Sequence, residues 1–142
     1  MDFASLDPAD RDVVVRALAL VGRVSPPHLA RIYATIPRAV FRVAACERGA
    51  STCTGGVLAH DLAFAEHPAD LGVEETAKLL VHESLHHDPR SGTLIQHAFR
   101  GRPTARQMAA DGIYAETEAV AVRFRGERCP DCGGHHSSRG AW

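Results

Sequence analysis

One short motif constrains the fold of this chain more than any other feature of its sequence. Residues 82–86 read His-Glu-Ser-Leu-His, the H-E-x-x-H pattern, and they follow apolar residues that recur at helical spacing from Val73 onward. Residues four apart on a helix are offset by only about 40°, so the imidazoles of His82 and His86 project from one face and can share one zinc ion. The motif therefore predicts a helix from about residue 73 to residue 88 that carries two metal ligands.

The second residue of the motif has a separate chemical role. Glu83 lies beside His82 on the edge of the predicted helix. From there its carboxylate can reach a metal-bound water without replacing it, take the proton of that water and pass it to a leaving amine. A zinc ion lowers the pKa of its bound water to roughly 7, which makes hydroxide available at neutral pH. Glu83 is therefore the predicted general base.

Composition places the chain among ordinary globular proteins and draws attention to histidine and cysteine. With 142 residues, 45% of them hydrophobic and 23% charged, the chain is long enough for one domain with a real core. A formal net charge of -1 removes the usual electrostatic argument for binding nucleic acid or an anionic membrane. Nine histidines and four cysteines are unusual counts that point towards metal chemistry.

Helical spacing and capping residues predict three further helices. The first is expected at about residues 8–21, where a capping aspartate and a first-turn proline begin the pattern and a glycine ends it. The second is expected between Ser25 and Pro37, which cannot continue a helix. Thr104 is expected to cap a long helix that runs to about Arg125.

Two strand-like runs, Ala39–Cys46 and Gly56–Ala65, flank a turn-rich stretch, and a hairpin is the simplest connection between them. These elements predict an α+β fold in which a small sheet packs on helices, with the metal site between the helices at 73–88 and 104–125. We expect a single domain over residues 1–142, divided into N-terminal helices at 1–37, a core at 39–125 and a Cys/His tail at 126–142.

Two histidines leave a catalytic zinc one protein ligand short. Three downstream residues are candidates for that position: His97, Glu116 and Glu118. The two glutamates lie in the middle of the expected long helix, where an inward-facing carboxylate is costly unless it meets a cation. The residues alone leave all three candidates open.

The surroundings of the motif resemble a known family of peptidases. Residues 54–57, Thr-Gly-Gly-Val, and residues 79–86, which lead into and include the motif, are similar to the edge strand and active-site helix of small gluzincins, the minigluzincins and their relatives. In that family the third ligand comes from a following helix that commonly reads E-x-x-A or E-x-E-A, and residues 116–119 match it. The resemblance covers about residues 54–124, and it implies a zincin-like domain in which Glu116 is the third ligand. It also implies that the strand Gly56–Ala65 forms the upper edge of a cleft and binds an extended peptide by strand addition.

The chain departs from that family at one position. Many relatives follow the alanine with an aspartate or asparagine that supports a histidine ligand, whereas this chain has Val120. Loss of such a supporting partner weakens metal affinity or activity. Asp61, Asp88 and Glu118 are candidate substitutes, among which the sequence does not choose.

A second family offers a rival assignment. SprT-like metalloproteases also carry H-E-x-x-H followed by a third histidine and a cysteine zinc ribbon, and the tail at residues 129–134 resembles one knuckle of such a ribbon. Under this resemblance His97 is the third ligand. If His97 is not a ligand, it is a candidate donor to a tetrahedral oxyanion, as is Tyr114.

The four cysteines suggest a second metal site. Cys129 and Cys132 have the spacing of a metal knuckle, and Cys46 and Cys53 flank the expected hairpin turn. A four-cysteine zinc site would join that turn to the tail. The two histidines at residues 135–136 are an alternative pair of ligands. The cysteines are otherwise expected to be reduced thiols or to form disulfides.

The sequence as a whole predicts a zinc metallopeptidase, in which a zinc-bound water activated by Glu83 hydrolyses peptide bonds of a peptide or protein substrate. The alternative is a zinc-containing binding or regulatory module with little or no turnover, and a non-peptide amidohydrolase would use the same metal chemistry. The apolar stretch near the N-terminus is interrupted by Arg16, Gly22 and Arg23, so we expect no signal peptide and a cytoplasmic protein.

Overall fold

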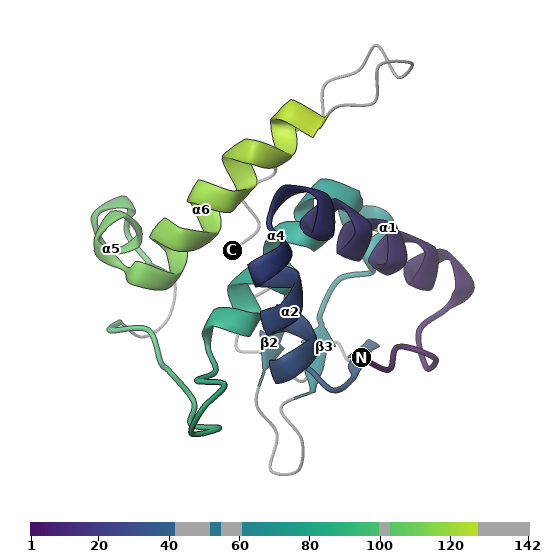
Figure 1. Cartoon of the computed structure of the whole chain (residues 1–142), viewed down its shortest axis with the longest axis horizontal. Coiled ribbons are helices and arrows are strands. Elements are labelled where there is room, and N and C mark those ends of the chain that lie inside the picture. Colours follow the sequence, from purple (N-terminus) through teal and green to yellow (C-terminus); the bar gives the residue numbers. More distant parts are fainter. Residues whose placement is uncertain (42–51, 55–60, 100–102, 128–142) are drawn as a thin grey trace.

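Six α-helices and three short strands make up the part of the chain that the computed structural model describes, residues 1–41, 52–54, 61–99 and 103–127 (Figure 1). In chain order the elements are α1 Pro8–Val24, α2 Pro26–Thr35, β1 Ala39–Phe41, β2 Thr52–Thr54, β3 Leu62–Phe64, α3 Pro68–Leu71, α4 Val73–Leu85, α5 Ala105–Ala110, α6 Gly112–Phe124 and a final 3-10 turn, Arg125–Glu127. The architecture is α+β and mostly helical. No helix within these ranges has the length and apolar character that crossing a membrane requires.

Helix α4 lies at the centre of the fold. Its residues from Glu74 to Leu85 are all buried, and it packs against α1, α2, α3 and α6 and touches β2. Fully buried apolar side chains of the shared core come from five elements, and they include Val14, Val21, Ile32, Phe64, Leu80, Val81 and Phe124. Because α1 and α2 contribute to this core, they cover the helix that carries the H-E-x-x-H motif and do not form a separate unit.

The three strands form one sheet in the order β1-β3-β2. Strand β1 pairs in parallel with β3, with Val40 opposite Ala63, and β2 pairs antiparallel with β3, with Cys53 opposite Ala63. The predicted hairpin between the two apolar runs is therefore wrong, because parallel strands need a crossover connection. Alternation of apolar residues identifies strands but does not choose their partners, and β2 lies inside the stretch that we predicted as a turn.

The position of β3 corrects a second expectation. The strand predicted at Gly56–Ala65 was assigned to the upper edge of a peptide-binding cleft, but its described part, β3, has a neighbour on each side. A strand with both edges paired cannot accept an added peptide strand. Residues 42–46 and 56–60 of the two predicted strands lie outside the described residues.

Helix α1 continues one turn beyond the predicted end at residue 21, to Val24. Gly22 does not end the helix. A Cβ atom at Gly22 would lie 2.9 Å from Cδ2 of Leu29, so the glycine allows the first turn of α2 to pack closely on α1. The chain turns instead at Ser25, whose N–H donates to the carbonyl oxygen of Val21. Helix α2 confirms the prediction for its region, whereas α4 begins at Val73 as predicted but ends at Leu85 and not at about residue 88.

The long helix predicted from Thr104 to about Arg125 is broken at Asp111. Thr104 and Gln107 form a capping box at the start of α5, as the sequence suggested. Asp111 then adopts an extended conformation, with φ -82° and ψ 126°, and its Oδ1 accepts hydrogen bonds from the N–H groups of Ile113 (2.9 Å) and Tyr114 (3.0 Å). Asp111 is therefore the N-cap of a new helix, α6, and its other carboxylate oxygen is available to a neighbour.

Candidate metal centre

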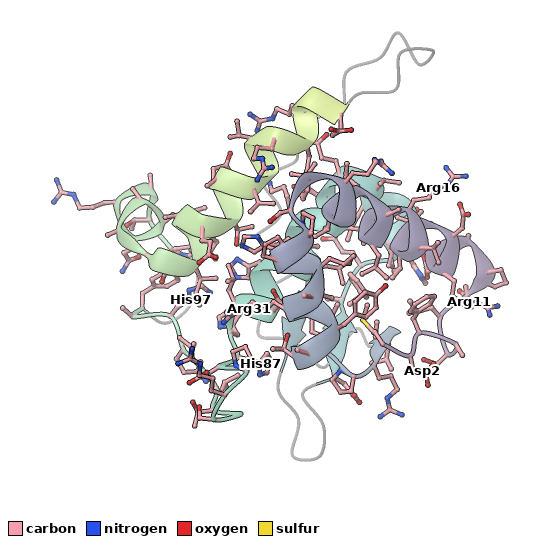
Figure 2. All side chains as sticks on the ribbon, viewed as in Figure 1. Asp2, Arg11, Arg16, Arg31, His87 and His97 are labelled. Carbon is pink, nitrogen blue, oxygen red and sulfur yellow. The ribbon has the colours of Figure 1, made fainter. Side chains whose placement is uncertain are left out.

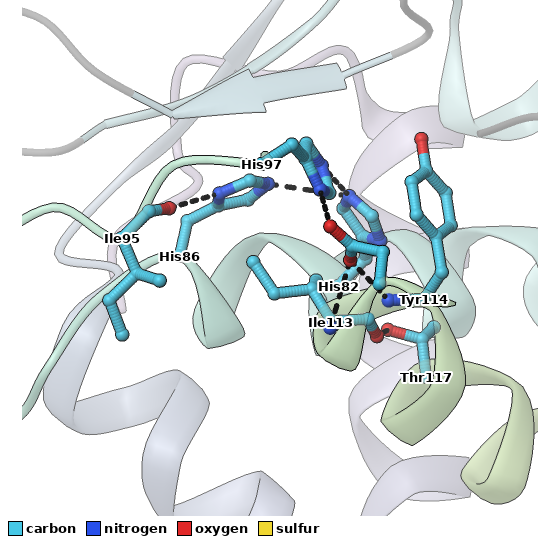
Figure 3. Close-up of polar contacts among 8 residues, drawn as sticks. His82, His86, Ile95, His97, Ile113, Tyr114 and Thr117 are labelled. Carbon is cyan, nitrogen blue, oxygen red and sulfur yellow. Dashed lines mark hydrogen bonds and ion pairs between the residues drawn. The ribbon is translucent and has the colours of Figure 1, made fainter. Parts of the chain in front are cut away.

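Three histidines bring their ring nitrogens to one point at the end of α4 (Figure 3). Nε2 of His82 lies 3.2 Å from Nε2 of His97 and 3.4 Å from Nε2 of His86. Two nitrogens bound to one tetrahedral zinc at about 2.0–2.1 Å are about 3.3–3.4 Å apart, so both separations fit a shared zinc ion. The residues present therefore fit a three-histidine metal centre.

Helix α4 ends within this centre. Its last residue is Leu85, and His86 takes the C-cap position with φ -72° and ψ -5°. Arg31 reaches across from α2 and donates from Nε to the carbonyl oxygen of Ser84 (3.0 Å) and from Nη2 to that of His87 (2.6 Å). Figure 2 labels Arg31 and His87 on the same side of α2. A cation at a helix C-terminus both satisfies free carbonyl groups and complements the helix dipole, so Arg31 fixes the end of the helix that carries the motif.

A tight turn then returns the chain to His86. The N–H of Asp88 donates to the carbonyl oxygen of Thr93 (3.0 Å), and Gly92, with φ 68°, adopts the left-handed conformation that glycine tolerates. After the turn the N–H of Ile95 donates to the carbonyl oxygen of His86. This short connection explains how His97, on an irregular segment, reaches the two motif histidines.

Hydrogen bonds to the outer ring nitrogens set the orientation of two of the rings. Nδ1 of His86 lies 2.7 Å from the carbonyl oxygen of Ile95, and Nδ1 of His97 lies 3.0 Å from Oδ2 of Asp111. A carbonyl or carboxylate oxygen only accepts, so Nδ1 of each ring carries a hydrogen, and in the neutral form of each ring Nε2 presents its lone pair to the centre.

The third ring is held in its neutral form. Burial lowers the pKa of His82 well below its ordinary value, and His86 and His97 lower it further. His82 is therefore neutral at neutral pH, and it does not donate a proton from Nε2 as a cation to the lone pairs of His86 and His97. A metal cation at the meeting point of the three nitrogens would remove the mutual repulsion of their lone pairs.

Asp111 supports the histidine at position 97. Burial by itself raises the pKa of Asp111, but the hydrogen bond from His97 and those from the N–H groups of Tyr114 and Ile113 outweigh it and hold the pKa below its ordinary value. The carboxylate is therefore ionised at neutral pH. A carboxylate that accepts from the outer nitrogen of a histidine orients the ring and raises its basicity towards a metal.

Sequence reasoning missed Asp111 and proposed three other carboxylates for this role. In the structure Asp61 pairs with Arg38, and Asp88 accepts from the N–H of Arg90 within the turn (2.9 Å). Glu118 lies 3.6 Å from Arg125 on the outer side of α6. The Asp-Gly pair at residues 111–112, a common break in a helical pattern, is the signal that could have identified the supporting residue.

An aromatic wall lies beside the histidines. The ring centroid of Tyr114 is 4.8 Å from those of His82 and His97, and the ring of Phe99 stacks on His97 at 4.9 Å. Burial, followed by the charges of Asp111 and Glu83, raises the pKa of Tyr114 to about 12. The tyrosine hydroxyl is therefore protonated over the whole neutral and mildly alkaline range.

The structure does not bring Glu116 to the motif histidines. Its side chain is 53% exposed, and Oε1 lies 2.9 Å from Nε2 of His28, whose Nδ1 is 2.6 Å from Oγ of Ser25. The structure therefore brings His97, and not the predicted third ligand Glu116, to His82 and His86. One face of α6 is buried against the core, and Glu116 and Glu118 do not lie on that face. The buried residues of α6 are Ile113, Tyr114, Thr117, Val120, Ala121 and Phe124.

The proposed cysteine site falls almost wholly outside the described residues. Cys46, Cys129 and Cys132 lie in segments that the structure does not describe, as does the histidine pair at 135–136. Cys53 is in β2, of which the structure describes the backbone pairing opposite Ala63. The four-cysteine zinc site remains a prediction from the sequence.

A second group of potential ligands within the described residues has a structural explanation. Asp7, Asp10 and His67 bring a carboxylate or ring atom close together at the start of α1. Oδ2 of the buried Asp10 lies 2.7 Å from Nδ1 of His67, and its Oδ1 accepts from the N–H of Ala69 (2.9 Å). Both oxygens of Asp10 are therefore engaged in joining α1 to α3, and the group is a helix-packing contact.

Comparison with models of protein families, with curated proteins and with solved structures finds no match for this chain.

Proposed function

We propose that this protein is a zinc-dependent hydrolase that cleaves peptide bonds, with His82, His86 and His97 as metal ligands and Glu83 as general base. The observation that carries the proposal is the convergence of three Nε2 atoms at spacings of 3.2 and 3.4 Å beside the glutamate of the motif. Three protein ligands leave one position of a tetrahedral zinc open, which is typical of catalytic sites and not of structural ones.

The residues around the centre support this chemistry. Zinc, when bound, supplies a Lewis acid that polarises a carbonyl group and acidifies water. In this proposal Glu83 accepts the proton of the attacking water and delivers it to the leaving amine. Tyr114, whose pKa is raised to about 12, is the proposed donor of a hydrogen bond to the oxygen that becomes negatively charged. Asp111 holds the ring of His97 with its lone pair towards the metal.

One observation favours a second candidate function, a zinc-containing binding or regulatory module. His82 and Glu83 are each only 4% exposed, so a substrate has to approach from the side of His86 and His97, which are partly exposed. A centre closed to substrates would retain zinc without turnover. The two candidates therefore differ in whether the carboxylate of Glu83 is needed for chemistry.

Replacement of Glu83 by glutamine separates the two functions. The change keeps the shape of the side chain and removes the base, so a peptidase should retain its zinc and lose about 10²–10⁴-fold in kcat. Cleavage products of a peptide library would be identified by mass spectrometry for the wild type, Glu83→Gln and a matched control, Glu116→Gln, which alters an exposed glutamate away from the centre. Equal cleavage by the wild type and Glu83→Gln, with zinc retained in both, would refute the hydrolytic proposal.

A further inference from the structure

The two sides of the candidate metal centre differ in their exposure to solvent. His82 and Tyr114 are buried, whereas His86, His97 and Phe99 are partly exposed. A substrate therefore reaches the centre on the side of His86 and His97. Phe99 stacks on His97, so it is the more exposed part of the aromatic wall on the side that a substrate approaches.

Phe99 belongs to a surface of three nearly parallel rings. Its plane is inclined by 16° to that of His97, and the plane of Tyr114 is inclined by 18°, with centroids 4.9 and 4.8 Å from that of His97. The rings of Phe99 and Tyr114 are 6.0 Å apart and inclined by 20°. Aromatic rings prefer such offset arrangements, with centroids about 4.5–7 Å apart. Because one of the three rings is a candidate metal ligand, this aromatic surface begins at the centre itself.

Phe99 lies close enough to the centre to contact a molecule bound at the metal. A zinc ion lies about 2.0–2.1 Å from a ligating histidine nitrogen, so the ring centre of Phe99 is within about 8 Å of a zinc held by Nε2 of His97. A side chain next to a carbonyl group at the metal reaches across this distance. The segment that carries Phe99 is also apolar elsewhere, since Leu94 and Ile95 are each 40% exposed and the carbonyl oxygen of Ile95 accepts from His86. An apolar group therefore meets a matching surface on this side.

We propose that Phe99 determines the specificity of the centre by stacking on an aromatic side chain next to the peptide bond that is cleaved. The proposal rests on the proposed hydrolytic function and adds a substrate class to it: peptides with phenylalanine, tyrosine or tryptophan at that position. A stacked aromatic pair contributes roughly 2- to 10-fold in affinity beyond the apolar area that it buries. A flat ring should therefore bind more tightly than a saturated ring of the same size.

Three hydroxamates with the same zinc-binding group test this stacking: benzohydroxamate, cyclohexanecarbohydroxamate and acetohydroxamate. In the zinc-loaded protein we expect benzohydroxamate to bind roughly 2- to 10-fold more tightly than the cyclohexane compound. Acetohydroxamate, which has no ring to bury, should bind least tightly. Nuclear Overhauser contacts should connect the ring protons of benzohydroxamate with those of Phe99.

Two matched substitutions test whether Phe99 carries the preference. Phe99→Leu keeps an apolar side chain and removes the flat ring, so the preference for benzohydroxamate over the cyclohexane compound should be lost. Zinc affinity and acetohydroxamate affinity should be unchanged in this variant. Tyr33→Leu makes the same kind of change at an aromatic residue that is 51% exposed on α2, and it should keep the preference.

Failure of this proposal and failure of the proposed function give different results. Equal binding of benzohydroxamate and the cyclohexane compound to the wild type, with both dependent on zinc, would overturn the role of Phe99 and leave the metal centre standing. A Phe99→Leu protein that keeps the preference but binds zinc or acetohydroxamate more weakly would show that Phe99 positions the ring of His97, and would also overturn it. Binding of all three hydroxamates without zinc would overturn the proposed function, and the specificity role of Phe99 with it.

Discussion

Replacement of Asp111 by asparagine separates two roles of one side chain. Oδ1 of Asp111 caps α6 by accepting from the N–H groups of Ile113 and Tyr114, and Oδ2 accepts from Nδ1 of His97. Asparagine keeps one oxygen and is as good an N-cap as aspartate. With that oxygen in the cap, its amide group faces Nδ1 of His97, where donor meets donor. The ring of His97 then loses the hydrogen bond that directs its Nε2 lone pair to the metal.

The magnitudes follow from this separation. Loss of a carboxylate that supports a histidine ligand typically weakens metal affinity 10- to 100-fold, and we expect Asp111→Asn to fall in this range. Since the cap is retained, the free energy of unfolding of the metal-free protein should fall only by the lost hydrogen bond to His97, about 0.5–1.5 kcal/mol. Asp111→Ala removes both roles, so it should lower the free energy of unfolding by about 1 kcal/mol more than Asp111→Asn does.

Zinc affinity would be measured by competition with a chromogenic chelator, and stability by urea unfolding of the metal-free protein. Asp12→Asn is the matched control, because Asp12 is 58% exposed on α1 and pairs with Arg16. It should leave both quantities unchanged. If Asp111→Asn binds zinc as tightly as the wild type, the pairing of Asp111 with His97 has no role in metal binding and the reasoning is refuted.

Three further predictions follow from the same contacts. His97→Ala should lose zinc and Glu116→Ala should keep it in a competition titration, and the reverse order would restore Glu116 as the ligand. Arg31→Ala removes two charge-assisted hydrogen bonds at the end of α4, so it should lower the free energy of unfolding, measured in urea, by roughly 1.5–3 kcal/mol. An unchanged midpoint of urea unfolding would contradict the role of Arg31 at the end of the helix. The hydrogen bond to Asp10 raises the pKa of His67 above its ordinary value of 6.5, so the stabilisation by this pair is complete below pH 6.5 and is lost as the pH rises through the raised pKa. His67→Gln should flatten the dependence of the urea midpoint on pH between these two values. A pH profile of the variant parallel to that of the wild type would refute this role of His67.

Local patterns in the sequence predicted the part of the site that lies on one helix. The spacing of His82 and His86 and the apolar residues before them identified α4 and placed both rings on one face. These features depend on helix geometry alone, which a sequence expresses directly. The same is true of the cap at Thr104.

The rest of the site depends on contacts between distant segments. His97 reaches the centre because the turn at residues 88–93 returns the chain to α4, and Asp111 meets it because the helix predicted across that position breaks there. The family resemblance favoured Glu116, but its phase on α6 directs it to His28. The prediction of strand pairing was wrong for a related reason, since the apolar pattern of β1 and β3 does not indicate whether the two strands pair in parallel or antiparallel.

X-ray absorption at the zinc edge, on protein loaded with one equivalent of zinc, tests the central claim most directly. A three-histidine centre predicts three imidazole nitrogens and one oxygen ligand at about 2.0–2.1 Å from the zinc. The imidazole signal should be lost in His82→Ala. A sulfur shell at about 2.3 Å would place the zinc on cysteines, and a protein that retains no zinc would leave the histidines without a metal. Either result would contradict a three-histidine zinc centre.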